Sequence, residues 1–247
     1  MHPEPITRFP PRAVHRPLAT QGWRDVTFLH WPYDPVDVRR VLPPQVEPDI
    51  HEGTTYVGVV GLRMVRVRLA GTPPLPYLGD FLETNVRVYS VDRAGRRGVV
   101  FLSMEASRLA FVLGARGAAQ LPYRWAAMHL DRDRDGVLLD YRTTRRWPRP
   151  RRAGLRFRVS IGGPVDGTPL DRFVADRWGL HASTRRGRLR YLPVAHEPWP
   201  LHSAELVEFR EEGLLEAAGL PAPQGPPTSV LYAPSTHSRI GIPISDR

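Results

Sequence analysis

Residues Thr55–Leu69, with the sequence TYVGVVGLRMVRVRL, decide the fold class of this chain. The stretch is rich in β-branched side chains, and its second half, from Met64 to Leu69, alternates apolar residues with arginine. That alternation is typical of a strand with one buried face and one face in water. We therefore expect one long strand, or a hairpin that breaks at Gly61.

Outside this stretch, turn signals recur every 8–15 residues, and most segments between them also favour strands. Phe81–Val91 and Gly98–Met104 are predicted to pair antiparallel across the turn DRAGRR. Other segments with strand composition are Arg24–His30, Arg124–Leu130, Val137–Thr143, Leu155–Ile161, Arg188–Val194, Ser203–Phe209 and short β segments in the tail from Ala222. Short helices are predicted at 36–42 after Asp34 and Pro35, at Ala106–Leu113, at Pro169–Trp178 after Thr168, and at Glu211–Ala218.

This succession of elements predicts a mainly β (α+β) fold, in which a closed or partly closed β-barrel carries a few covering helices. Residues 1–20 are rich in proline and arginine, and we expect them to form an extended arm. The remainder, 21–247, contains no internal repeat and no linker-like segment, which favours a single domain.

The formal charge is +10, and all 35 basic residues are arginine. A GC-rich genome that favours arginine codons explains this composition, and a basic surface for nucleic acid or an anionic ligand is the alternative. The arginines are densest at Arg142–Arg158, where Trp147, Pro148 and Pro150 rule out one continuous basic helix. Since the stretch contains no recognisable nucleic-acid module, we expect a solvated charged connection and no nucleic-acid partner.

Other kinds of protein and site are excluded by what the sequence lacks. It has no run of about 18 apolar residues to cross a membrane and no apolar segment of a secretory signal, so we expect a cytoplasmic protein. The absence of cysteine excludes disulfides and thiolate sites. No nucleophile elbow, Walker loop, zinc-protease motif or dinucleotide fingerprint occurs, and the nine histidines are scattered. We therefore expect neither a metal nor a cofactor.

Three short motifs follow one another along the chain. Arg24 precedes an Asp-Pro turn at Asp34, GDFLE occupies residues 79–83, and LPYR at 121–124 leads into a strand. Their order and spacing over roughly residues 20–130 resemble acetoacetate decarboxylase. Most of the chain more closely resembles the uncharacterised YqjF-like branch of that superfamily, on the segments FLHWPYDP (28–35), LPYRWAAM (121–128), HEPWPL (196–201) and VLYAPSTHSRIG (230–241). This resemblance implies an acetoacetate decarboxylase-like β-barrel and a homo-oligomer.

By this resemblance, Arg24 falls at the family's substrate-binding arginine and Glu83 at its catalytic-site glutamate. Tyr123 stands where the family has its Schiff-base lysine, and Arg124 stands at the neighbouring lysine, whose charge lowers the pKa of the nucleophile. A phenol cannot condense with a ketone to an iminium, and a guanidinium is protonated and is not an amine nucleophile. Because the chain has no lysine, decarboxylation through a lysine imine is excluded.

Arg24, Glu83, Tyr123 and Arg124 are predicted to converge in one pocket. Two guanidiniums can bind a carboxylate, and Tyr123 can donate a hydrogen bond to a carbonyl oxygen that gains negative charge. Glu83 would then act as a general base. We expect a small-molecule enzyme that acts on a carbonyl compound or organic acid, by proton abstraction, an aldol-type step, hydration or lactone opening.

Asn85, Arg87 and His196 are further candidates for substrate binding. Asn85 and Arg87 share the face of Glu83 because side chains alternate along a strand. Prolines on both sides of Trp199 hold an extended segment. This segment either presents His196 to the pocket mouth or leaves it in solvent while Trp199 anchors the packing.

Three alternatives stay open. In the first, Glu83 is an internal counter-ion for Arg24 or Arg124, and Tyr123 and Trp125 are plain core aromatics. In the second, the same pocket binds a small molecule without turnover. The third is an arginine-rich nucleic-acid binder that uses residues 142–158.

Overall fold

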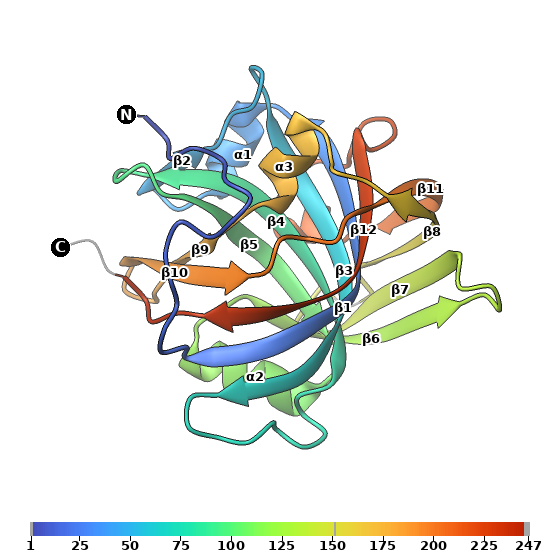
Figure 1. Cartoon of the computed structure of the whole chain (residues 1–247), viewed down its shortest axis with the longest axis horizontal. Coiled ribbons are helices and arrows are strands. Elements are labelled where there is room, and N and C mark those ends of the chain that lie inside the picture. Colours follow the sequence, from blue (N-terminus) through green and yellow to red (C-terminus); the bar gives the residue numbers. More distant parts are fainter. Residues whose placement is uncertain (1, 151, 245–247) are drawn as a thin grey trace.

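A computed structural model describes residues 2–150 and 152–244 of the chain (Figure 1). These residues form long strands with a few short helices. In chain order the elements are β1 Ala19–Tyr33, α1 Pro35–Val41, β2 Val46–Pro48, β3 Thr55–Leu69, β4 Phe81–Asp92, β5 Arg97–Ala106, α2 Leu109–Ala118, β6 Tyr123–Arg132, β7 Leu138–Trp147, β8 Gly154–Pro164, α3 Pro169–Ala175, β9 Gly179–Ser183, β10 Leu189–His196, β11 His202–Glu212, the 3-10 helix η1 Glu216–Ala218 and β12 Ser229–Ile240. The predicted mainly β class with a few covering helices is confirmed.

All the strands belong to one sheet, in the order β10-β9-β5-β6-β7-β8-β11-β12-β1-β3-β4-β2. Two additional pairings close this sheet on itself. Pairing of β4 with β5 completes a ring through β6, β7, β8, β11, β12, β1 and β3, and pairing of β10 with β12 completes a smaller ring through β9 and β5. The strands β12, β1, β3, β4 and β5 belong to both rings, so each of their faces looks into a different interior.

Thr55–Leu69 is one continuous strand, as one of the two predictions had it. Gly61 does not break it. A Cβ at Gly61 would lie 2.7 Å from the ring of Phe157, so glycine is needed here for close packing rather than for a turn. The other predicted strands are confirmed with longer bounds, and the tail forms the single strand β12 instead of short segments. The short strands β2 and β9 were not predicted.

The helix predictions were right where a cap is present. The Asp34 carboxylate accepts from Val36 N at 2.7 Å at the start of α1, and Thr168 and Asp171 form a capping box at the start of α3. α3 ends at Ala175, earlier than predicted, and α2 starts later, at Leu109.

The predicted helix Glu211–Ala218 is wrong. The strand β11 continues to Glu212, and only Glu216–Ala218 turns as a 3-10 helix. The carboxylate of Glu211 accepts from Gly213 N and Leu215 N, and these bonds stabilise a turn in place of a helical start.

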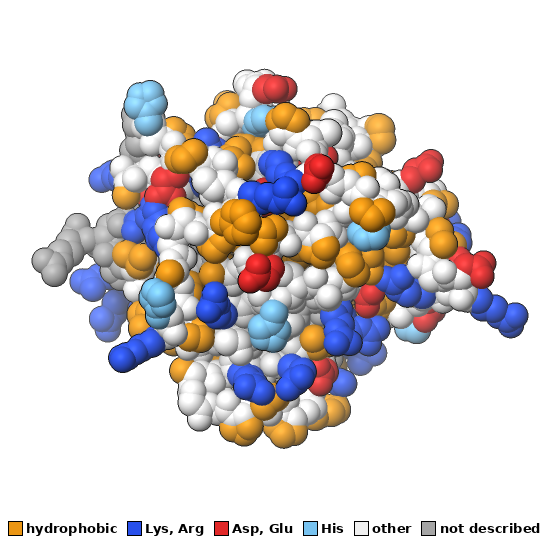
Figure 2. Space-filling model, in the orientation of Figure 1, with side chains coloured by type: hydrophobic (Ala, Val, Ile, Leu, Met, Phe, Trp, Pro, Cys, Tyr) orange, Lys and Arg blue, Asp and Glu red, His pale blue; other side chains and the backbone are white. Residues whose placement is uncertain are grey.

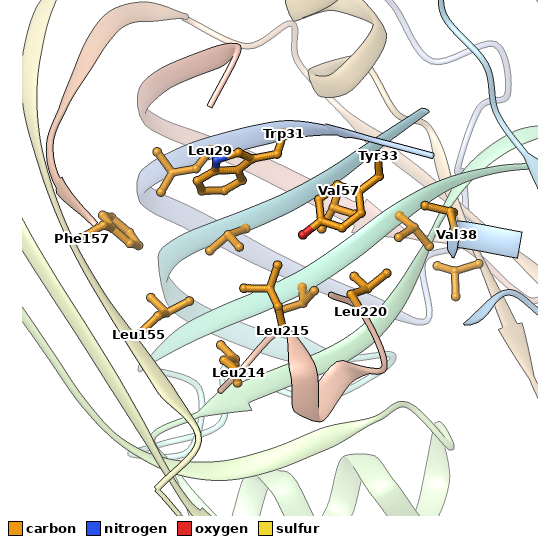
Figure 3. Close-up of a cluster of buried hydrophobic side chains, with 14 of the residues drawn as sticks. Leu29, Trp31, Tyr33, Val38, Val57, Leu155, Phe157, Leu214, Leu215 and Leu220 are labelled. Carbon is orange, nitrogen blue, oxygen red and sulfur yellow. The ribbon is translucent and has the colours of Figure 1, made fainter. Parts of the chain in front are cut away.

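The larger ring is filled by an apolar core. This core includes Leu29, Trp31 and Tyr33 of β1 together with Leu155 and Phe157 of β8 (Figure 3). Leu214, Leu215 and Leu220, around η1, close the same cluster. Because this core occupies one face of the shared strands, a cavity can form only against their other face.

The N-terminal residues 2–18 lie outside any helix or strand. Glu4 N donates to Gly95 O at 2.8 Å, and the indole of Trp178 donates to Thr7 O at 2.8 Å, so the segment is bound to the sheet. No helix over the described residues is long and apolar enough to span a lipid bilayer.

The arginine-rich stretch is mostly strand, which corrects the prediction of a solvated connection. β7 continues to Trp147 and β8 begins at Gly154, and the side chain of Arg145 is fully buried. Arg156 forms ion pairs with Asp140 and Glu208; residue 151 of this stretch lies outside the described residues. On the face shown in Figure 2, acidic side chains stand among the arginines.

Candidate functional site

A cavity of about 600 Å³ lies inside the smaller ring. Its walls are mostly apolar side chains of β1, β3, β5, β9 and β10, among them Phe28, Leu62, Met64 and Phe101. α2 covers one end of the strands, with Phe111 against the cavity, and α1 and α3 lie toward the opposite end (Figure 1). The size suits a ligand of drug-like dimensions.

Polar side chains in this cavity form a line along β4. Glu83, Asn85 and Arg87 all point into it, as strand alternation predicted. Each residue of a strand advances the backbone by about 3.3 Å, so the Cα atoms of Glu83 and Arg87 are roughly 13 Å apart. The cavity therefore has a carboxylate toward the α2 end and a guanidinium further along the strand.

Glu83 and Tyr123 are hydrogen-bonded inside the cavity. The Tyr123 hydroxyl donates to Glu83 Oε2 at 3.0 Å, and Asn85 Nδ2 donates to Oε1 at 3.5 Å. Glu83 and Tyr123 are 1% and 5% exposed. Tyr123 enters the cavity at the start of β6, where its ring meets Phe111 of α2 edge to face.

Burial raises the pKa of Glu83 to about 7, although the hydrogen bonds from Tyr123 and Asn85 act in the opposite direction. Burial and the nearby Glu83 carboxylate raise the pKa of Tyr123 well above its ordinary value. Tyr123 is thus a protonated donor at neutral pH, and Glu83 keeps its proton to a higher pH than an exposed glutamate does. Over the described residues Glu83 forms no ion pair, so the reading of Glu83 as a counter-ion for Arg24 or Arg124 is wrong.

Arg87 is a buried cation without a carboxylate partner among the described residues. Nε donates to the Tyr89 hydroxyl at 3.2 Å and Nη2 to Val174 O at 3.0 Å. Nη1 has no hydrogen-bond acceptor within residues 2–150 and 152–244, although Arg87 lines the cavity. A buried guanidinium with a free donor is suited to an anionic ligand.

Arg177 is a cavity residue that the sequence analysis missed. Its Nε donates to Phe173 O at 2.6 Å and Nη1 pairs with Asp49, while Nη2 is buried without a partner in the described chain. Asp49 also pairs with Arg97, so one carboxylate serves two guanidiniums.

Arg177 and Arg87 both line the cavity, and both guanidinium carbons lie over the Tyr89 ring, at 4.8 and 5.6 Å from its centre. The cavity wall therefore carries an excess of positive charge at this place. Arg177 follows a short helix and has no motif around it, so no local signal pointed to this position.

His196 lines the cavity, and it does not lie in solvent. It is 6% exposed, and its ring packs between Trp178 and Trp199 with centroid distances of 4.6 Å to each. Trp199 is buried too and stacks on Trp23, so both readings of the HEPWPL segment hold in part. Burial lowers the pKa of His196 to about 4, and the imidazole is neutral at physiological pH.

Arg24 lies outside the cavity, which corrects the prediction that it converges with Glu83. Trp23 and Val26 face the cavity while Arg24 is exposed. The next residue, Asp25, has φ +52°, and the register of β1 against β3 shifts here by one residue. On the β12 side of β1, Asp25 lies opposite Pro234, which has no N–H to donate a hydrogen bond between the two strands. The bulge exchanges the two faces of β1.

Arg124 is also outside the cavity, and the reason is strand alternation. Since Tyr123 points into the cavity, its neighbour on β6 points to the opposite face. Arg124 lines a separate cleft beside Arg116. Of the residues predicted for the site, the structure thus brings together Glu83, Tyr123, Asn85, Arg87 and His196, and it separates Arg24 and Arg124 from them.

Among the described residues, no three His, Asp or Glu side chains are grouped as ligands for a metal ion. The polar groups of the cavity are a carboxyl, a phenol, an amide, an imidazole and guanidiniums. Together they can bind an anion, donate to an oxygen and accept a proton.

Comparison with known proteins places this chain in a family. The DUF2071 family, described as an uncharacterized conserved protein (COG2071), matches residues 20–237. The uncharacterized protein YqjF of Bacillus subtilis (strain 168) is 30% identical over 211 residues, which are 85% of each chain.

Solved structures show the same fold at low identity. The enduracididine biosynthesis enzyme MppR complexed with pyruvate superposes with a TM-score of 0.63 at 17% identity, over 95% of this chain and 93% of that one. Acetoacetate decarboxylase from Legionella pneumophila gives 0.61 at 16% identity, over 96% and 91%. An acetoacetate decarboxylase-like enzyme from Sphingomonas wittichii RW1 gives 0.63 at 13%, over 95% and 94%. The chain is therefore a member of the DUF2071 family, similar to YqjF, with an acetoacetate decarboxylase-like fold.

Proposed function

We propose that this protein is a small-molecule enzyme that removes a proton next to the carbonyl group of an organic acid. Glu83 is the base, and Tyr123 stabilises the enolate that forms. The observation that carries the proposal is the 3.0 Å hydrogen bond between these two buried side chains inside a mostly apolar cavity. The likeness of the fold to acetoacetate decarboxylase and MppR supports an enzyme of this superfamily.

The base is suited to work near neutral pH. A pKa of about 7 leaves a substantial ionised fraction of Glu83 while making its carboxylate more basic than an exposed one. The C–H proton passes to Glu83, the electron pair of the broken bond forms the C=C bond of the enolate, and the π pair of the carbonyl group moves onto its oxygen.

Tyr123 provides the donor for that oxygen. Its raised pKa keeps the phenol protonated, and a hydrogen bond to an oxygen strengthens as negative charge develops there. The phenol has one proton, so donating to the substrate removes the bond that it makes to Glu83 in the free protein. Because that bond lowers the pKa of Glu83, substrate binding makes the base stronger at the moment when it is needed.

The substrate class follows from the rest of the cavity. Arg87 Nη1 is a donor without a protein partner in the described chain, and it suits a carboxylate; the charge of Arg177 lies on the same cavity wall. The volume of about 600 Å³ and the apolar walls suit an acid with a hydrocarbon chain, larger than a three-carbon acid. MppR, which is described as complexed with pyruvate, supports a keto acid as the general class.

An isotope experiment tests the proposal directly. Aliphatic oxo acids of five to ten carbons are incubated with the protein in D₂O. Their ketone stands next to the terminal methyl group, away from the carboxylate, to match the separation of Glu83 and Arg87 along β4. Loss of the proton NMR signals next to the ketone is followed against a protein-free sample. We expect faster exchange with the longer acids and no enzymatic exchange with Glu83→Gln. Arg24→Gln is the matched control, because Arg24 is exposed and outside the cavity, and it should exchange at the wild-type rate.

Ligand binding without exchange would contradict the proposal in favour of a binding protein that uses the same cavity without turnover. A thermal-shift titration of the same acids separates that result from the absence of binding. Exchange that persists in Glu83→Gln would remove Glu83 as the base.

A further inference from the structure

A second cleft, outside the cavity of the proposed function, has a volume of about 660 Å³. It lies where α2 ends, beside β9 and the segment that follows α1, and it shares part of its lining with the cavity, including Phe101 of β5 and Leu121. Tyr123 and Arg124 are adjacent on β6 and point to different sides, one into the cavity and one into this cleft.

The charged lining of the cleft is basic. Arg116, Arg124 and Arg185 line it, and no aspartate or glutamate does so among the described residues. The nearest acid, Glu105, is already used, because it forms a fully buried ion pair with Arg145 at 2.7 Å. The charges that act on Arg124 are thus the guanidiniums of Arg145 and Arg116 and the carboxylate of Glu105, which is paired with Arg145.

Arg124 has donors that nothing in the described chain accepts. Its Nε is buried without a hydrogen-bond partner, and its guanidinium forms no ion pair within residues 2–150 and 152–244. Burial, and then the charges of Arg145 and Arg116, lower the pKa of Arg124. Such crowding of like charges is unfavourable unless an anion compensates it.

The other two arginines are placed to assist. Arg116 Nη1 donates to Tyr123 O at 2.7 Å, which holds its guanidinium beside Arg124. Arg185 is exposed at the rim, where its backbone N–H donates to Gln120 Oε1 at 3.0 Å. Apolar side chains, among them Leu42, Val100 and Leu102, form another part of the lining.

We propose that this cleft binds a phosphoryl group on the guanidiniums of Arg116, Arg124 and Arg185, with the apolar part of the cleft against the organic moiety that carries it. Three guanidiniums match the charge and the several acceptor oxygens of a phosphate better than a single carboxylate. The source is either free phosphate or a phosphate monoester, and the two share this chemistry.

Calorimetric titration at constant ionic strength tests the assignment, with inorganic phosphate and phenyl phosphate as the two probes and chloride as the reference ion. We expect saturable one-to-one binding of both probes, with phenyl phosphate tighter because its ring meets the apolar lining. Equal affinity for the two would overturn the part of the assignment that concerns the organic moiety. Saturable binding of neither would overturn the whole.

Two variants separate a site from the overall positive charge. Arg124→Gln should weaken phosphate binding at least tenfold, whereas Arg24→Gln, which removes the same charge from an exposed position elsewhere, should stay within twofold of wild type. Equal losses in both would reduce the effect to nonspecific attraction by a basic protein and overturn the proposal.

If circular dichroism shows that Arg124→Gln does not fold, Arg185→Gln takes its place, because Arg185 is exposed. We expect it to weaken phosphate binding several-fold, and unchanged affinity would contradict the proposed site. Binding of phosphate should be unchanged in Glu83→Gln. Failure in the cleft is thus distinguishable from failure of the proposed function.

Discussion

The Tyr123 hydroxyl lies 3.0 Å from Glu83 Oε2 and donates a hydrogen bond to it, although the two residues are 40 positions apart in the chain. β4 brings the carboxylate and β6 brings the phenol, and both side chains are buried at the same end of one cavity. This pair sets the protonation state of the site, and most of the expected behaviour of the protein depends on it.

The stability of the protein should fall between pH 4.5 and 7 because of Glu83. The folded state keeps the Glu83 proton up to about pH 7, whereas an unperturbed glutamate releases it at 4.5. The unfolded chain therefore binds fewer protons in this window, and the contribution present below pH 4.5 is lost as the pH rises to 7. We expect Glu83→Gln to gain about 3 kcal/mol relative to wild type between pH 4.5 and 8, measured by urea unfolding. An unchanged difference between the two proteins would place the Glu83 pKa near its ordinary value.

Tyr123→Phe should slow isotope exchange about 100-fold, because it removes the donor for the enolate oxygen. It should also shift the rising limb of the pH–rate profile to higher pH, since the Tyr123 hydrogen bond lowers the pKa of Glu83. The limb concerned is that of kcat/KM, which reports the free protein, where the Tyr123–Glu83 hydrogen bond exists. A lower rate with an unmoved limb would mean that Tyr123 does not lower the pKa of Glu83 in the free protein.

Arg87→Gln should weaken the binding of the same oxo acids by about 10- to 100-fold, the usual effect of losing a charge-assisted hydrogen bond. Ketones of the same chain length without a carboxylate should bind with unchanged affinity. The measurement is a calorimetric titration of both ligand series with wild type, Arg87→Gln and the control Arg24→Gln. Equal losses for acids and ketones would indicate a structural role for Arg87.

Glu105→Gln should destabilise the protein by about 3–5 kcal/mol, because it leaves the Arg145 guanidinium uncompensated in the interior. The double substitution Glu105→Leu with Arg145→Met should cost less than the single one, since it removes both charges. Urea unfolding of these two variants beside Arg24→Met, expected within about 0.5 kcal/mol of wild type, checks this. A double variant less stable than the single one would contradict it.

Gly61→Ala should destabilise the protein by about 1–3 kcal/mol through overpacking, because a Cβ there would lie 2.7 Å from Phe157. Gly163→Ala is the matched control in β8, since a Cβ at that glycine meets nothing within 4 Å. Thermal unfolding of both variants gives the comparison. Equal stability of the two would mean that the Phe157 ring moves aside without cost.

The line Glu83, Asn85 and Arg87 was predictable from the sequence because three alternate positions of one strand share a face whatever surrounds it. The strands themselves were predictable for the same reason, from alternation and turn residues. The position of His196 could not be predicted. The prolines beside Trp199 indicate an extended segment but do not show whether its side chains face the cavity or solvent. Arg177 carried no local signal, because its position depends on the contact of α3 with β4 through Arg87 and Val174.

The sequence by itself determined two things about this protein: which residues share a strand face, and that a chain without lysine cannot use a lysine imine. Tertiary structure decided which of the two faces encloses the cavity, because the sheet closes twice and both faces of the shared strands are buried. It also decided the place of Arg24, since one inserted residue at Asp25 turns Trp23 toward the cavity and Arg24 to the other side. A sequence of alternating apolar and polar residues gives no sign of such a bulge. Where the bulge forms is determined by the pairing of β1 with β3 and β12.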